Sequence, residues 1–117
     1  MERINKRCIN GVDVYTHSKE ISSANILEVE AGTTGFCGGD TGHGGRTYLR
    51  IKDLGGTDIK SVSSEQGVEI LLGGDTELQT ICEALQFILD TIEKDITTQK
   101  VLTDRQLYEE SLRLERK

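Results

Sequence analysis

The chain has 117 residues and a net charge of −6, and only 35% of its residues are hydrophobic. This length fits a single domain, residues 1–117, and so lean an apolar content favours a homo-oligomer, which buries surface that one copy cannot. The negative charge argues against nucleic-acid polymers and anionic membranes as partners. No apolar run reaches the roughly 20 residues that a membrane helix needs. The three cysteines are odd in number and widely spaced, which is typical of reduced thiols, and we expect a cytoplasmic protein.

The first predicted element is a hairpin in residues 4–17. Asn10 and Gly11 stand between two strand-like runs. Asn-Gly is a strong hairpin signal, because both central residues of a type I′ turn need a positive φ. Residues 18–23 are mostly polar, and we interpret them as a connector.

Two alternating runs follow, at residues 25–31 and 47–52. Apolar and charged residues alternate in both runs, which predicts two half-buried strands. Antiparallel pairing sets the charged side chains of the two strands opposite one another, as exposed ion pairs: Glu28 and Glu30 against Arg50 and Lys52. Such pairs help to define the register of the strands more than they add stability.

The rest of the chain predicts a turn at residues 54–58, a weaker hairpin over 59–72 and two helices. From Thr76 onward the apolar residues are spaced by three and four, which indicates an amphipathic helix with a capping box at its start. Its predicted core stripe is Leu78, Ile81, Leu85, Ile88 and Ile92, widened by Cys82 and Leu89. A second capping box predicts that a short, charged helix begins at Thr103. The fold class expected is therefore α+β, an antiparallel sheet of hairpins followed by two α-helices.

The most distinctive stretch is residues 32–47, which hold seven of the thirteen glycines between two predicted strands. Ordering so many glycines is entropically unfavourable, which indicates a loop with a function. Consecutive glycines allow backbone N–H groups to converge on a phosphate, and Arg46 at the end of the loop offers a forked cation. We expect the ligand-binding residues to be Phe36, Gly38, Gly39, Asp40, Thr41, His43, Gly44, Gly45, Arg46 and Tyr48.

In this site Asp40, Thr41 and His43 would hold the polar edges of a nucleotide, and Phe36 or Tyr48 would stack on it. The loop opens a strand and lacks a Lys-Ser or Lys-Thr pair, which excludes the Walker A motif. It also lacks the βαβ context of the dinucleotide-binding fingerprint. We therefore expect no catalytic residue, no metal and no cofactor.

Several alternatives remain open for the same loop. A hydrolase would use His43 or Asp40 as its base, and a nucleophile pair would use Cys37 and His43. A metal would accept Cys37, Asp40 and His43 as ligands. A purely structural reading makes the loop a flexible hairpin, or the docking element of a protein-interaction module.

Three runs also carry a family resemblance: GFCGGDTGHGGRTY at residues 35–48, LEVE at 27–30 and DLGGTDI at 53–59. Together they resemble a group of small proteins from phages and their Gram-positive hosts. In size, acidity and plan the chain is similar to the anti-defence sponges of the anti-Thoeris and anti-CBASS type. This resemblance implies a homo-oligomer in the host cytoplasm that sequesters a cyclic nucleotide or a cyclic ADP-ribose without cleaving it.

Overall fold

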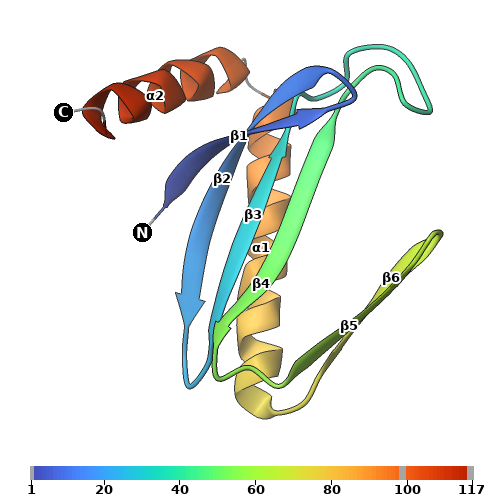
Figure 1. Ribbon diagram of the computed structural model, residues 1–117, viewed down its shortest axis with the longest axis vertical. Coiled ribbons are helices and arrows are strands. Elements are labelled where there is room, and N and C mark those ends of the chain that lie inside the picture. Colours follow the sequence, from blue (N-terminus) through green and yellow to red (C-terminus); the bar gives the residue numbers. More distant parts are fainter. Residues whose placement is uncertain (1, 98–99, 116–117) are drawn as a thin grey trace.

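The computed structural model describes residues 2–97 and 100–115. Six strands precede two helices in the chain: β1 (Arg3–Ile9), β2 (Val12–Ser22), β3 (Ile26–Thr33), β4 (Thr47–Gly55), β5 (Ile59–Ser64), β6 (Gly67–Leu72), α1 (Asp75–Thr97) and α2 (Lys100–Glu115). The first four strands form an antiparallel sheet in the order β1-β2-β3-β4, while β5 and β6 form a separate hairpin that projects from the body (Figure 1). The expected α+β class is confirmed. No helix of the described residues is long and apolar enough to cross a membrane.

The turn between β1 and β2 has the predicted geometry. Asn10 and Gly11 have φ angles of 49° and 79°, which are the positive values that the Asn-Gly signal predicts. The interpretation of residues 18–23 as a connector is wrong, because β2 continues to Ser22 and pairs with β3 from Ser18↔Glu30 to Ser22↔Ile26. Polar side chains are accommodated there because the strand pairing is made by the backbone.

The pairing of β3 with β4 also follows the prediction. Glu28 lies opposite Lys52, and Glu30 lies opposite Arg50. The expectation that both pairs are exposed is wrong, since Glu30 is 0% exposed. Alternation along β3 places Glu30 on the face of the sheet that is turned away from α1.

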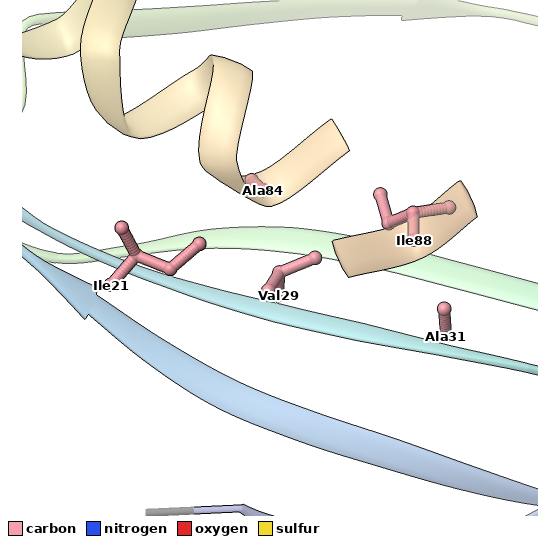
Figure 2. Packing of buried hydrophobic residues seen from close by; sticks show 5 residues of the cluster. All are labelled: Ile21, Val29, Ala31, Ala84 and Ile88. Carbon is pink, nitrogen blue, oxygen red and sulfur yellow. The ribbon is translucent and has the colours of Figure 1, made fainter. Parts of the chain in front are cut away.

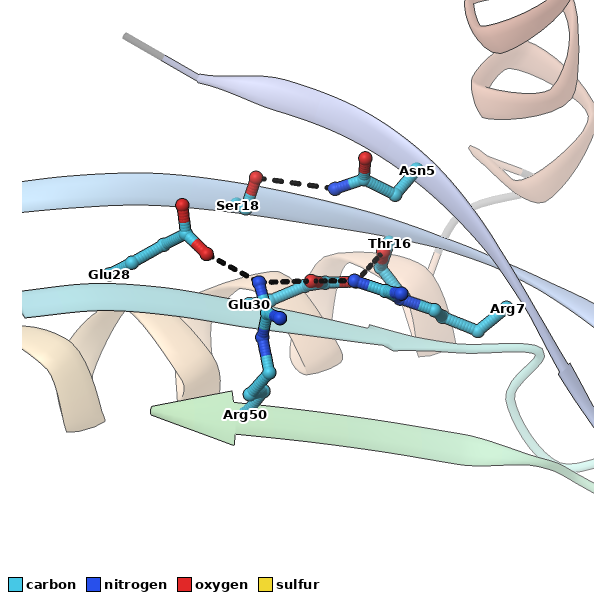
Figure 3. A network of polar contacts seen from close by, with 7 residues as sticks. All are labelled: Asn5, Arg7, Thr16, Ser18, Glu28, Glu30 and Arg50. Atoms are coloured by element: carbon cyan, nitrogen blue, oxygen red, sulfur yellow. Dashed lines mark hydrogen bonds and ion pairs between the residues drawn. The ribbon is translucent and has the colours of Figure 1, made fainter. Parts of the chain in front are cut away.

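Glu30 is the centre of a polar network on that open face (Figure 3). Its carboxylate accepts hydrogen bonds from Arg7 Nε at 2.7 Å and Thr16 Oγ1 at 2.5 Å, and it pairs with Arg50 at 3.3 Å. Arg50 also donates to Glu28. Burial raises the pKa of the Glu30 carboxyl, but the hydrogen bonds from Arg7 and Thr16 outweigh burial and the net pKa is lowered.

On the other face of the sheet a small apolar core lies beneath α1 (Figure 2). Its buried members are Ile21, Val29, Ala31, Ala84 and Ile88. Partly buried apolar side chains pack around this cluster: Ile51, Ile81, Phe87 and Ile92. The two small residues, one on β3 and one on α1, allow the helix to approach the sheet closely.

The predicted core stripe of α1 is correct only in part. Leu78, Cys82, Leu85 and Leu89 are exposed, whereas the buried positions of α1 also include Thr80, Thr91 and Asp95. Two buried polar contacts fix this rotation of the helix. The Asn25 amide donates to Thr80 Oγ1 at 3.0 Å, and the Thr33 N–H donates to Asp95 Oδ2 at 3.2 Å.

The start of α1 differs from the predicted capping box. The helix begins at Asp75, and the hydroxyl of Thr76 donates to Glu77 Oε1 at 2.8 Å. Glu77 instead accepts the N–H of Asp58 at 3.0 Å, which ties the base of the β5–β6 hairpin to the helix. Hydrogen bonds from the Asp58 N–H and then from the Thr76 hydroxyl lower the pKa of Glu77.

The second helix begins earlier than predicted, at Lys100, so Thr103 lies inside α2 and is not its N-cap. Side chains of α2 hold it against β1 and β2. The rings of Tyr15 and Tyr108 are 5.6 Å apart, and His17 Nε2 lies 3.0 Å from Asp104 Oδ2. This helix therefore covers a different part of the sheet from α1 (Figure 1).

Candidate functional site

The glycine-rich stretch forms a loop between the end of β3 and the start of β4, as predicted. Its base is closed by the Thr34 N–H, which donates to the carbonyl of Arg46 at 3.0 Å. The hydroxyls of Thr33 and Thr47 also bond to each other at 2.8 Å. These bonds anchor the loop where the pairing of β3 with β4 ends, at one end of the molecule (Figure 1).

The glycines allow the two sides of the loop to touch through their backbones. A Cβ on Gly45 would overlap the carbonyl oxygen of Gly35, and a Cβ on Gly44 would lie 2.5 Å from the carbonyl oxygen of Gly39. Both approaches exclude any other residue type. Gly38 and Gly39 have φ angles of 80° and 134°, which an L side chain rarely adopts.

A cavity of about 550 Å³ lies between this loop and the C-terminal part of α1. Its lining residues are Thr33, Gly35, Phe36, Cys37, Gly38, Gly39, Asp40, Gly45, Thr47, Ile92 and Ile96. The volume falls within the range of about 300–1,000 Å³ that is usual for small-molecule sites. The end of β3, the start of β4, the loop backbone and α1 therefore all contribute to the wall of the cavity.

The walls of the cavity differ in chemistry. The helix supplies two apolar side chains, Ile92 and Ile96, and the loop supplies mainly backbone. Within the described chain the amides of Gly38 and Gly39 have no protein acceptor, so they can donate to a bound anion. Phe36 lies at the rim with 90% of its surface exposed, which leaves its ring free to stack on a planar group.

Half of the predicted ligand-binding residues line this cavity: Phe36, Gly38, Gly39, Asp40 and Gly45. The other half do not line it: Thr41, His43, Gly44, Arg46 and Tyr48. The structure therefore separates residues that the sequence places in one site. Two members of the second group, Arg46 and Tyr48, contact other parts of the protein.

Arg46 is turned away from the cavity and toward the β1–β2 turn. Its guanidinium donates to the carbonyl of Gly44 at 2.6 Å, to that of Ile9 at 3.2 Å and to that of Asn10 at 3.4 Å. This geometry does not favour the predicted pairing of Arg46 with a phosphate. It makes Arg46 a residue that positions the loop against the neighbouring hairpin.

Tyr48 lies on the open face of the sheet, where the guanidinium of Arg7 is 4.9 Å from the centre of its ring. This cation–π contact extends the network around Glu30. Tyr48 is therefore on the side of the sheet away from the cavity and is not in a position to stack on a ligand there, whereas Phe36 lines the cavity.

Six of the lining residues are absent from the predicted ligand-binding set: Thr33, Gly35, Cys37, Thr47, Ile92 and Ile96. Thr33, Gly35 and Cys37 lie within or beside the glycine-rich stretch, so their position in the chain was an available signal. The two isoleucines come from a helix that is distant in sequence. Their part in the site depends on how α1 crosses the sheet, which the spacing of apolar residues does not reveal.

The residues considered above as metal ligands do not gather. Within the described residues no group of three or more Cys, His, Asp or Glu side chains is close enough to hold a metal ion, and this includes Cys37, Asp40 and His43. Cys37 instead lies near backbone, with its Sγ 3.5 Å from the carbonyl oxygen of Thr34.

Comparison with known protein families, with characterised proteins and with solved structures finds no match to this chain.

Proposed function

We propose that the protein binds a small phosphate-bearing signalling nucleotide, of the cyclic nucleotide or cyclic ADP-ribose type, in the cavity beneath the glycine-rich loop. In this proposal the protein sequesters the nucleotide without cleaving it. It acts as a homo-oligomer in the cytoplasm, where thiols such as Cys37 stay reduced.

The observation that carries the proposal is the composition of the cavity. One wall includes Gly38 and Gly39, whose amides have no protein acceptor within the described residues and suit a phosphate, and the other includes Ile92 and Ile96, which suit the flat face of a base. Phe36 at the rim adds an aromatic face. A ligand with both an anionic and an aromatic part matches these walls better than a purely apolar or a purely anionic one.

The same geometry favours sequestration over hydrolysis. The hydrolase alternative needs His43 or Asp40 beside the ligand as a general base. Asp40 lines the cavity, whereas His43 does not. Arg46, the arginine of the loop, is bonded to three backbone carbonyls and is not placed to stabilise a leaving oxygen.

Calorimetric titration with a panel of linear nucleotides, cyclic nucleotides and cyclic ADP-riboses tests the proposal. We expect at least one member to bind, and chromatography after a long incubation should return that ligand intact. The variant Gly45→Ala forces the two sides of the loop apart, because its Cβ overlaps the carbonyl of Gly35, and it should weaken binding at least tenfold.

Gly67→Ala is the matched control, because Gly67 lies in the β5–β6 hairpin and a Cβ there meets no atom within 4 Å. It should bind as the wild type does. The proposal fails if no member of the panel binds, or if Gly45→Ala binds as tightly as Gly67→Ala. Recovery of a cleaved product would favour the hydrolase instead.

One observation favours a second candidate, a protein-interaction module that docks through the loop. Phe36 is the most exposed of the large apolar side chains described, at 90%. A docking loop would bind no nucleotide, and Phe36→Ala would abolish capture of a protein partner.

A further inference from the structure

In the part of the chain that the structure describes, one edge of β4 has no strand partner. In the described part of the chain β4 pairs with β3 alone, so the other edge of this nine-residue strand presents unpaired backbone groups. Such an edge is a template for pairing with a further strand. Leu49 of β4, on the face toward α1, is 56% exposed.

The free apolar face of α1 looks toward this same side. Phe87, on one flank of the helix, lies beside β2, where Lys19 Nζ is 5.9 Å from the centre of its ring. On the opposite flank, Ile92 and Ile96 share the cavity with Thr47 of β4. Helical geometry places the exposed leucines of α1 next to these isoleucines, and therefore on the β4 side.

The spacing of this apolar face is that of a helix-pairing seam. Its members are Leu78, Cys82, Leu85, Leu89, Ile92 and Ile96, separated by steps of four, three, four, three and four. This is the alternation of a heptad repeat, which matches a second helix with the same repeat. The other helix of the chain, α2, packs on β1 and β2 and does not offer that partner.

The β5–β6 hairpin extends beyond the body on the β4 side (Figure 1). A two-stranded hairpin alone is marginally stable in water, and this one exposes apolar side chains. Eight exposed apolar residues lie on the hairpin and on α1: Val62, Val68, Ile70, Leu71, Leu78, Leu85, Leu89 and Ile96. That number exceeds the seven hydrophobic residues that are buried in the described chain as a whole, a balance that a monomer in water does not favour.

We infer that a second copy of this chain docks on the β4 side. Two-fold symmetry sets β4 edge to edge with the β4 of the partner and packs α1 against the partner's α1. The occupant is a second copy because the strand edge and the helix seam are each self-complementary. Helix, strand and hairpin all offer exposed apolar residues to a partner, and a stable dimer buries roughly 800 Å² on each copy.

The dimer also has a consequence for the cavity, and this part of the inference rests on the proposed function. Ile92 and Ile96 belong both to the helix seam and to the cavity wall. A partner helix seated on the seam therefore borders the cavity, so dimer formation and nucleotide binding are thermodynamically linked.

Sedimentation equilibrium without nucleotide tests the interface, so its outcome is independent of ligand binding. The wild type should have twice the chain mass of 12.9 kDa. The double variant Leu85→Glu, Leu89→Glu should sediment at the mass of one chain, since it places charges in the seam. Leu114→Glu makes the same change at an exposed leucine of α2 and should remain dimeric.

Leu49→Lys provides a second variant on β4 and should also be monomeric. Circular dichroism spectra equal to that of the wild type establish that each variant is folded. A wild type of single-chain mass at about 100 μM overturns the inference. So does a dimer that survives both the double variant and Leu49→Lys. If the dimer is confirmed but titration finds no ligand, the interface stands and the proposed function fails.

Discussion

The two faces of α1 both carry apolar residues, but only one of them is buried. The face on the sheet includes Thr80, Thr91 and Asp95, while the outward face carries Leu78 and Leu85. Hydrogen bonds toward both ends of the helix, to Thr80 and to Asp95, explain why these polar residues lie on the buried face. An apolar stripe therefore identifies a helix reliably, but it does not show which surface of the molecule will cover that stripe.

The same lesson applies to the sheet. On β3, Glu30 is buried as completely as Val29, although the two side chains lie on opposite faces. Glu30 is covered by the arginines that pair with it, and Val29 is covered by α1. A strand pattern that appears half-buried is therefore buried on both faces in this region.

A carboxylate introduced on each face of α1 should produce the largest difference in stability. Ala84 is 0% exposed and belongs to the core, so Ala84→Asp buries an unpaired charge and should lower the free energy of unfolding by about 3–5 kcal/mol. Leu85 is 54% exposed, so Leu85→Asp should change it by less than about 0.5 kcal/mol. Urea unfolding of dilute protein, below the concentration at which copies associate, measures both. Equal effects of the two variants would contradict the assigned faces.

A second prediction concerns the buried carboxylate on the other face of the sheet. Glu30→Ala leaves Arg7 and Arg50 without their shared partner, and it should lower the free energy of unfolding by about 3 kcal/mol. Lys52→Ala, which removes an exposed charge from the same pairing ladder, is the control and should have an effect below about 1 kcal/mol. Comparable effects in urea unfolding would mean that the network contributes no more than a surface pair.

Glu30 also makes stability depend on pH. Its pKa is lower in the folded than in the unfolded chain, so the folded state binds fewer protons. The stabilisation is complete above the unfolded pKa and is lost as the pH falls through the folded pKa, below about pH 4. The melting temperature of Glu30→Gln should therefore fall less between pH 6 and pH 3 than that of the wild type. An equal fall in melting temperature for the two proteins over this pH range would exclude the assignment.

The smallest expected stability change is at the loop. Arg46→Ala removes three bonds to backbone carbonyls, and the free energy of unfolding should fall by about 1–2 kcal/mol. Hydrogen exchange should accelerate in residues 34–46 and at the β1–β2 turn, since Arg46 joins them. Exchange that changes only within the loop would indicate that the link to the Ile9 carbonyl has no mechanical role.

Most of the fold was accessible from local sequence signals. The Asn-Gly turn, the register of β3 with β4, the β5–β6 hairpin and the helix from about residue 76 all depend on neighbouring residues, and all are confirmed. The rotation of α1 depends on Asn25 meeting Thr80 and on Thr33 meeting Asp95. Each of these contacts joins two residues that are more than 50 positions apart in the sequence, so no local pattern predicts them.

The candidate site was predictable to a similar extent. The glycine spacing located the loop, because close backbone approach requires glycine at positions such as 44 and 45. It did not show which loop residues face inward. Arg46 illustrates the difficulty, since a cation beside a glycine loop fits a phosphate and a set of carbonyl oxygens equally well, and only the position of the β1–β2 turn distinguishes them.

Native mass spectrometry after incubation with the nucleotide panel tests the central claim most directly, because it reports the mass of the bound molecule. We predict a complex whose added mass equals that of one intact nucleotide for each occupied cavity, and that the complex weakens in Gly45→Ala. Spectra that show only the ligand-free protein with every member of the panel would contradict the account.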